Sequence, residues 1–181
     1  PPVARMRELV AALRAIFAAW QDGERLDFRG DFYTHTLMPP LFNPGPLEWG
    51  PPPLWLGGLG PKMVEMVATV ADGLLVMPFC TERFLTEHTL VAVQRGLDAS
   101  GRARGEFTIV CESIVAVGRD AEEQRVAAEG VRMLLSFYGS TPSYRPVLEA
   151  HGWGDLQTEL QLMTRAGEWD RMPALVDDEM L

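Results

Sequence analysis

A glycine-rich stretch in the first half of the chain carries the clearest chemical signal in the sequence. It combines three glycines with the three residues that open the following helical pattern: Gly57, Gly58, Gly60, Pro61, Lys62 and Met63. Glycine backbone can approach a ligand closely, and a helix N-terminus offers unpaired N–H groups with partial positive charge. These features predict an anion site. A tight strand-to-helix turn explains the same residues equally well, because the stretch is neither a GxGxxG motif nor a Walker loop.

A second candidate lies where the next apolar run ends. Thr81 follows a run of strand length, and ligands of α/β sheets bind beyond the carboxyl ends of the strands. A threonine in front of a helical pattern more often serves as the N-cap of that helix. We therefore predict Thr81 as a cofactor contact, with the capping role as the alternative.

The other chemistry-bearing residues give weaker indications. Cys80 and Cys111 lie in apolar runs without metal-type spacing, which favours two buried reduced thiols over a disulfide or a site. Glu112 interrupts an apolar run, so it is either an ion-paired structural residue or a pocket group. His35 could line a pocket, although a lone loop histidine is more often a surface residue. No catalytic triad, carboxylate pair or HExxH pattern occurs, so the sequence assigns no catalytic residue and no metal site.

Helical and strand patterns alternate along the chain. Apolar residues at helical spacing predict a helix over 3–20, whereas Gly, Pro, Asp and Asn over 21–53 predict an irregular excursion. Three apolar runs follow, each with a helical pattern after it. The predicted strands are Leu54–Gly57, Leu74–Pro78 and Phe107–Val117, and the predicted helices cover 61–70, 81–100 and 120–138, with Asp120 as an N-cap. The remainder, 139–181, is a helical tail with patterns over 145–151, 156–165 and 169–181.

This alternation indicates an α/β fold. Strands that are apolar at nearly every position predict right-handed βαβ units in a parallel sheet with both faces covered. Three such strands leave edges and faces unprotected, and the chain opens in a helix without an initial methionine. We therefore expect a single partial domain over 1–181, a fragment or processed product. Alone it is expected to be inactive and either poorly folded or self-associated.

Composition excludes several functional classes. The chain has 181 residues, of which 47% are hydrophobic, as in an ordinary folded domain, and a net charge of -9. The negative net charge disfavours binding to nucleic acid, because non-specific binding of this kind depends on basic patches. No apolar run approaches the roughly 20 residues of a membrane-spanning helix, and the first residues lack a signal-peptide pattern. We expect a cytoplasmic protein with neither a nucleic-acid nor a membrane partner.

An ordered set of motifs is similar to the luciferase-like monooxygenase superfamily, and within it to the oxidoreductases that depend on the deazaflavin coenzyme F420. The motifs in chain order are RMRE at 5–8, FRGDFY at 28–33, PPPLWLGG at 51–58, GPKM at 60–63 and ADG at 71–73. Two tail motifs, FYGSTP at 137–142 and HGWGDL at 151–156, look like those of one actinobacterial-type F420 branch. With them the ordered set extends over nearly the whole chain, and it is more specific than any one of its parts.

The resemblance implies a (β/α)8 TIM barrel of the bacterial-luciferase type, in which the three predicted strands would be the fifth to seventh. It also implies that Gly57, Gly58, Gly60, Lys62 and Met63 help to hold the ring and phosphate of the cofactor. In that family the polar groups that assist hydride transfer come mainly from earlier strands, which this sequence does not contain.

The resemblance further implies hydride transfer between coenzyme F420 and a small organic substrate. An FMN-dependent monooxygenase is an alternative, because both cofactors share one pocket in this superfamily. A non-catalytic barrel fragment that binds no cofactor is an alternative from a different class. Kinship of fold does not define the substrate. A homo-oligomer is the expected assembly.

Overall fold

The structure is a computed structural model that describes residues 2–181. Its α/β elements fall into two compact units. Unit 1 contains the described residues up to Leu75 together with Val91–Val110, and unit 2 contains Val76–Leu90 and Cys111–Leu181. The two units are interleaved along the sequence, since the chain passes between them after Leu75, after Leu90 and after Val110.

A long amphipathic helix opens unit 1. Helix α1 spans Pro2–Gln21, which confirms the helix predicted over 3–20. Its buried residues are Val10, Ala12 and Ala19, and it packs against helix α2. The small side chains on this face allow the two helices to approach closely.

The excursion that follows contains little regular structure, as its composition predicts. Strands β1 (Phe28–Arg29) and β2 (Thr34–His35) form a short antiparallel pair, and η1 (Pro40–Phe42) is a single turn of 3₁₀ helix. The Glu8 carboxylate of α1 accepts hydrogen bonds from the backbone N–H groups of residues 31, 32 and 33, at 2.7 to 3.0 Å. This carboxylate therefore ties the tip of the hairpin to the helix.

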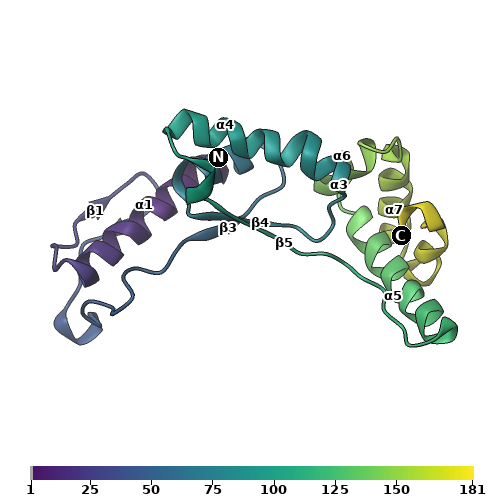
Figure 1. Cartoon of the computed structure of the whole chain (residues 1–181), viewed down its shortest axis with the longest axis horizontal. Helices are drawn as coiled ribbons and strands as arrows, with labels where there is room; N and C mark the ends of the chain where they lie inside the picture. Colours follow the sequence, from purple (N-terminus) through teal and green to yellow (C-terminus); the bar gives the residue numbers. More distant parts are fainter. Residues whose placement is uncertain (1) are drawn as a thin grey trace. The chain divides into compact units, whose positions relative to one another are not determined.

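Three strands form the sheet in the order β3–β4–β5 (Figure 1). Strand β3 is Trp55–Gly57, β4 is Gly73–Val76 and β5 is Thr108–Cys111. β3 and β4 are parallel, with Leu56 opposite Leu74, and β5 is the other neighbour of β4. The sequence therefore predicts the three strands and their adjacency.

The third strand is shorter than predicted. The sequence suggests a strand over Phe107–Val117, but β5 ends at Cys111. Glu112 and Ser113 are exposed beyond it, and the side chains of Val115 and Val117 are 70% and 77% exposed. A run of β-branched residues therefore does not extend the strand where no burial accompanies it.

Helices complete unit 1. Helix α2 spans Pro61–Val70, and α4 spans Leu90–Ser100, with η3 (Arg104–Glu106) after it. Gly101 ends α4 with a φ of 67°, a left-handed conformation that glycine adopts without steric cost.

Unit 2 consists mainly of helices. Its elements are α3 (Glu82–Phe84), the π-helical turn η2 (Leu85–Thr89), α5 (Ala121–Gly139), η4 (Pro142–Tyr144), α6 (Arg145–Glu149), α7 (Gly154–Ala166), η5 (Trp169–Leu175) and η6 (Asp178–Met180). Asp120 caps α5 by accepting from the Glu123 N–H at 2.9 Å, as the sequence predicts.

The end of the tail is 3₁₀-helical, not α-helical. Pro173 lies inside η5, where it lacks the N–H that an α-helix needs. Met172 is nevertheless buried, and η5 packs against α5 and α7. Arg132 of α5 donates to the carbonyl oxygen of Val176 and to the Asp178 carboxylate, so charge as well as apolar packing holds the tail on the helix.

Among residues 2–181, no helix is both long enough and apolar enough to cross a membrane. The same residues contain no group of three or more His, Cys, Asp or Glu side chains placed to hold a metal ion.

One carboxylate links α1 to the start of the sheet. Asp72 accepts from the Leu54 N–H at 2.7 Å and from the Arg14 guanidinium at 2.9 Å. Burial raises the pKa of Asp72, but the Leu54 amide, Arg14 and the charge of Arg102 together lower it below its ordinary value of 3.8. A group with a lowered folded-state pKa stabilises the fold at neutral pH and loses that contribution as the pH falls through the folded-state pKa.

We predict that Asp72→Asn lowers the free energy of unfolding at pH 7 by about 1 kcal/mol, because the charge on two hydrogen bonds is lost while water screens the half-exposed ion pair. Urea unfolding measures the effect. Wild-type protein should lose this increment progressively as the pH falls below the ordinary value of 3.8 and through the lowered folded-state pKa of Asp72, and the variant should not. The matched control is Asp22→Asn, at an exposed position. Equal stability of the two variants at pH 7 would contradict the assignment.

Candidate functional site

The glycine loop lies between β3 and α2. Gly60 is the N-cap of α2, and Pro61 occupies the first helical turn, where its missing N–H costs nothing. The backbone N–H groups of Met63 and Val64 both donate to the Gly60 carbonyl at 3.0 Å. The Lys62 N–H lies in the first turn, where the helix itself offers no acceptor. The loop therefore presents a helix N-terminus with a free backbone donor and the positive end of the helix dipole.

Lys62 places a positively charged side chain in the first turn of α2. It is exposed, and among residues 2–181 no carboxylate lies within 4.0 Å of its ammonium group. A cation in the first turn of a helix is disfavoured by the helix dipole, so Lys62 adds to the positive potential of the loop without local compensation. Such an arrangement attracts an anion.

Gly58 lies close against the first turn of α2. A Cβ atom at this position would lie 3.2 Å from Cγ of Met63 and 3.5 Å from Cγ2 of Val64. At Gly60, in contrast, a Cβ atom would meet nothing within 4 Å, which leaves open space beside the helix end. Gly58 thus packs closely on the helix, whereas Gly60 borders open space.

Thr81 belongs to unit 2, whereas the glycine loop belongs to unit 1. Its Oγ1 accepts from the Phe84 N–H at 3.2 Å, so Thr81 is the N-cap of α3, which is the alternative that the sequence offers. Oγ1 also lies 2.7 Å from Nε2 of His151. The Thr81 hydroxyl therefore links the segment that follows β4 to the turn that follows α6.

His151 is a residue that the sequence pattern does not reveal. Its ring stacks on Trp153 with a centroid separation of 4.5 Å and an interplanar angle of 14°. Arg83 strengthens the same junction by donating to the Ala150 carbonyl at 3.1 Å. The contact with Thr81 spans 70 positions in sequence, so no local spacing could predict it.

The remaining candidates of the sequence differ in how far they are buried. Cys80 and Cys111 are both free, but only Cys80 is half-buried, so the prediction of two buried thiols is wrong for Cys111, whose strand lies open to solvent. Burial, with a smaller contribution from Cys111, raises the pKa of Cys80 to about 11. Glu112 is exposed and needs no ion pair. His35 is half-buried and stacks on Tyr33.

Comparison with known proteins identifies the family of the chain. The family described as luciferase-like monooxygenase matches residues 1–181. The chain belongs to the luciferase-like monooxygenase family. The relationship to this family suggested by the motifs is thereby confirmed.

Relatives within the family differ in how much is known of them. An uncharacterized protein of Mycobacterium tuberculosis is 51% identical over 180 residues, which cover 99% of this chain and 53% of that protein. The 5,10-methylenetetrahydromethanopterin reductase of Archaeoglobus fulgidus is 28% identical over 187 residues, covering 99% of this chain and 51% of the reductase. The chain thus spans about half the length of the curated relatives it matches.

A solved structure has a similar fold. The coenzyme F420 dependent tetrahydromethanopterin reductase from Methanopyrus kandleri superposes with a TM-score of 0.71 and 17% sequence identity, over 92% of this chain and 46% of that one. This likeness supports the α/β fold of the family.

We predict that Thr81→Val lowers the free energy of unfolding by about 1 kcal/mol, because the Phe84 N–H loses its capping acceptor and His151 its partner. Chemical denaturation gives the value. Thr81→Ser keeps the hydroxyl and should restore most of it. Thr86→Val is the matched control, since the Thr86 hydroxyl donates only to carbonyls of its own helix. A Thr81→Val protein no less stable than Thr86→Val would show that the hydroxyl contributes nothing.

Proposed function

We propose that this chain is part of an oxidoreductase that transfers a hydride between coenzyme F420 and a small organic substrate. The observation that carries the proposal is the β3–loop–α2 segment, where Lys62 is exposed in the first turn of α2 and a Cβ atom at the N-cap Gly60 would meet nothing within 4 Å. Family membership and the similarity to reductases of the F420 type support it.

The residues present fit an anionic cofactor. A phosphate at the start of α2 would meet the Lys62 ammonium group, the Lys62 N–H and the positive end of the helix dipole. Gly57, the last residue of β3, and Gly58 after it carry no side chains, and Met63 provides an apolar surface beside Gly58. These residues would bind and orient the cofactor, and the deazaflavin supplies the hydride chemistry when bound.

FMN is the alternative cofactor, because it also carries a flat ring system and a phosphate. The same loop would then serve a monooxygenase. A non-catalytic protein that binds neither cofactor is the alternative from a different class. In such a protein the glycines would only shape the turn. Fluorescence titration with F420 and with FMN separates these three outcomes, and binding of neither would overturn the proposal.

We further propose that β3, β4 and β5 are consecutive strands of an eight-stranded barrel, in the positions of the fifth to seventh strands. The parallel pairing of β3 with β4 and the α2 crossover between them support this arrangement. In a barrel, ligands bind at the carboxyl ends of the strands, and the glycine loop follows the carboxyl end of β3.

We predict that Lys62→Ala, in the longest protein that the gene encodes, raises the Kd for F420 roughly 5- to 150-fold, which corresponds to about 1 to 3 kcal/mol for a lost charge-assisted contact. Fluorescence titration gives the Kd. Because the contact is electrostatic, the loss should shrink as ionic strength rises.

Two variants control this experiment. Lys62→Arg keeps the positive charge and should retain most of the affinity. Arg95→Ala removes a positive charge from the same unit, where Arg95 lies 3.7 Å from Glu65, and should leave the Kd unchanged. An unchanged Kd for Lys62→Ala would assign the loop to turn geometry alone.

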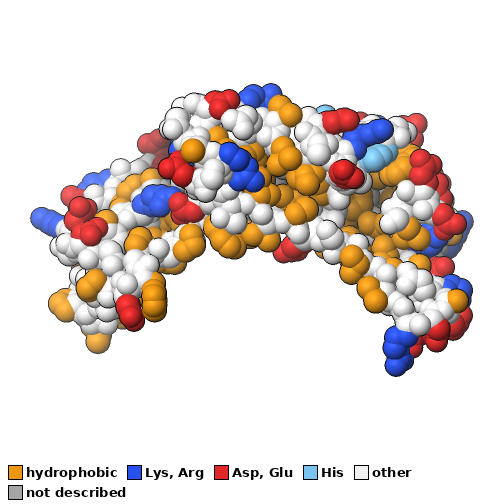
Figure 2. Space-filling view, viewed as in Figure 1, with side chains coloured by type: hydrophobic (Ala, Val, Ile, Leu, Met, Phe, Trp, Pro, Cys, Tyr) orange, Lys and Arg blue, Asp and Glu red, His pale blue; other side chains and the backbone are white. Residues whose placement is uncertain are grey.

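We also propose that the protein forms a homo-oligomer through the excursion. Large apolar side chains are open to solvent there, and Figure 2 shows hydrophobic side chains on this part of the surface. The most exposed are Leu37 (80%), Leu41 (87%), Phe42 (70%) and Trp49 (89%). Clusters of this kind mark association surfaces.

Size-exclusion chromatography with light scattering tests the assembly. We predict a mass above that of the monomer, and a shift toward the monomer in the double variant Leu41→Glu with Trp49→Glu, because charges would have to be buried in the interface. Leu162→Glu, at an exposed position of α7, is the control and should not change the mass. A wild-type monomer would contradict the proposal.

A further inference from the structure

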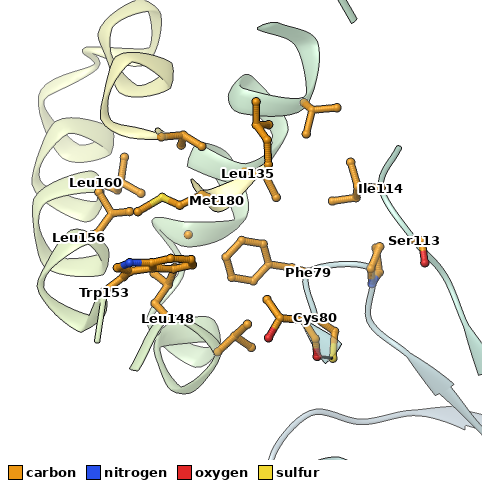
Figure 3. A pocket seen from close by; sticks show the side chains of 17 residues that line it. Phe79, Cys80, Ser113, Ile114, Leu135, Leu148, Trp153, Leu156, Leu160 and Met180 are labelled. Atoms are coloured by element: carbon orange, nitrogen blue, oxygen red, sulfur yellow. Dashed lines mark hydrogen bonds between the residues drawn. The ribbon is translucent and has the colours of Figure 1, made fainter. Parts of the chain in front are cut away.

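Unit 2 contains a cavity of about 310 Å³ among its helices (Figure 3). Its wall comes from the segment after β4, from the segment after β5, and from α5, α6, α7 and the end of the tail. The lining includes Phe79, Cys80, Ser113, Leu135, Trp153 and Leu160. All of them belong to unit 2.

The wall is predominantly apolar and its deeper part is firmly packed. Leu160 is fully buried, and Val147 and Leu148 are 2% and 5% exposed. Phe79 is held by the rings of Tyr138 and Tyr144, at centroid separations of 5.9 and 5.7 Å. A cavity bounded by such residues keeps its shape, because the side chains around it already have their own packing partners.

Polar groups of the wall are few, neutral and grouped. Figure 3 shows Cys80 and Ser113 on one side of the cavity, whereas Trp153, Leu156 and Leu160 lie on the other. The Thr81 hydroxyl belongs to the same strand end as Cys80 and is fixed by Phe84 and His151. No lining residue carries a charged side chain.

Size and chemistry together define the ligand. The volume lies at the lower end of the range of about 300 to 1,000 Å³ for small-molecule pockets. It corresponds to roughly ten times the volume of about 30 Å³ that a water molecule takes in the liquid, and hence to roughly ten non-hydrogen atoms. Water filling such an apolar space would lack hydrogen-bond partners, so an apolar body displaces it favourably.

We propose that this cavity is a binding site for a neutral small molecule with a flat or branched apolar body of about ten carbon atoms and one hydrogen-bonding group directed toward Cys80 and Ser113. The lining side chains carry no charge, so an ion would lose its hydration there without a side-chain partner of opposite charge, which disfavours charged ligands. The site stands on unit 2 alone, and it does not depend on cofactor binding at the glycine loop.

Matched probes test the chemical class. We use 2-naphthol, which is neutral, and 2-naphthoate, which has the same ring system and a negative charge. Calorimetry should show saturable binding of 2-naphthol and at least about tenfold weaker binding of 2-naphthoate, because of the desolvation cost of the carboxylate. Nuclear Overhauser effects between the naphthol protons and the methyl groups of Ile114 and Leu135 should place the ring in the cavity.

Two variants locate the site without altering the glycine loop. Leu135→Trp fills the cavity from α5 and should abolish 2-naphthol binding. Its control is Met133→Trp on the same helix, where the side chain is 61% exposed and does not line the cavity. If Leu135→Trp fails to fold, Ile114→Phe fills the cavity from a segment outside the helices and serves the same purpose.

Each outcome decides the proposal. Binding of 2-naphthol that is lost in Leu135→Trp or Ile114→Phe and kept in Met133→Trp supports it. Absence of 2-naphthol binding, equal affinity for 2-naphthoate, or binding that survives the filling variant overturns it. A measurement of F420 affinity on the same samples keeps the two sites apart, since filling the cavity should leave F420 binding at the glycine loop unchanged.

Discussion

The carboxylate of Asp72 is the contact on which the architecture of unit 1 depends. It accepts the backbone N–H at the start of β3 and the guanidinium of Arg14 from α1, while its own residue leads into β4. The Asp72 N–H donates to the Leu54 carbonyl at 2.8 Å, and its carbonyl accepts from the Thr108 N–H at 3.0 Å. One residue thus connects the three strands and the first helix. Because β3 leads directly into the glycine loop, the orientation of that loop follows from this contact.

Unit 2 depends on a comparable junction of different chemistry. The Thr81 hydroxyl satisfies the first turn of α3 and at the same time contacts His151, so the strand end and the turn after α6 are fixed by one atom. The apolar wall of the cavity begins on both sides of this contact, with Phe79 and Trp153. Because the Thr81 hydroxyl already has protein partners, few unpaired polar groups line the cavity. Shape and the cost of burying a charge therefore decide which ligand the cavity would accept.

Local signals in the sequence predict local structure well. Helix α1, the Pro61 start of α2, the Asp120 cap and the glycine stop at Gly101 all follow from residue types within one turn of the chain. The extent of β5 could not be predicted, because β-branched residues favour a strand only where burial accompanies them. The contact between Thr81 and His151 could not be predicted either, since a hydrogen bond across 70 positions has no periodicity. The position of the glycine loop at a strand end was predictable, because an apolar run of strand length leads directly into it.

The glycine loop and the cavity of unit 2, the two proposed sites, differ in the interaction that would bind a ligand. At the glycine loop, exposed backbone and the single lysine of the chain face solvent, so attraction of an anion depends on charge and on the open space that Gly60 leaves. In unit 2, the wall holds no charge, and the gain on binding comes from removing apolar surface from water. An anionic ligand would therefore be attracted by the glycine loop and disfavoured by the cavity, whereas a neutral apolar ligand gains little from an exposed helix end.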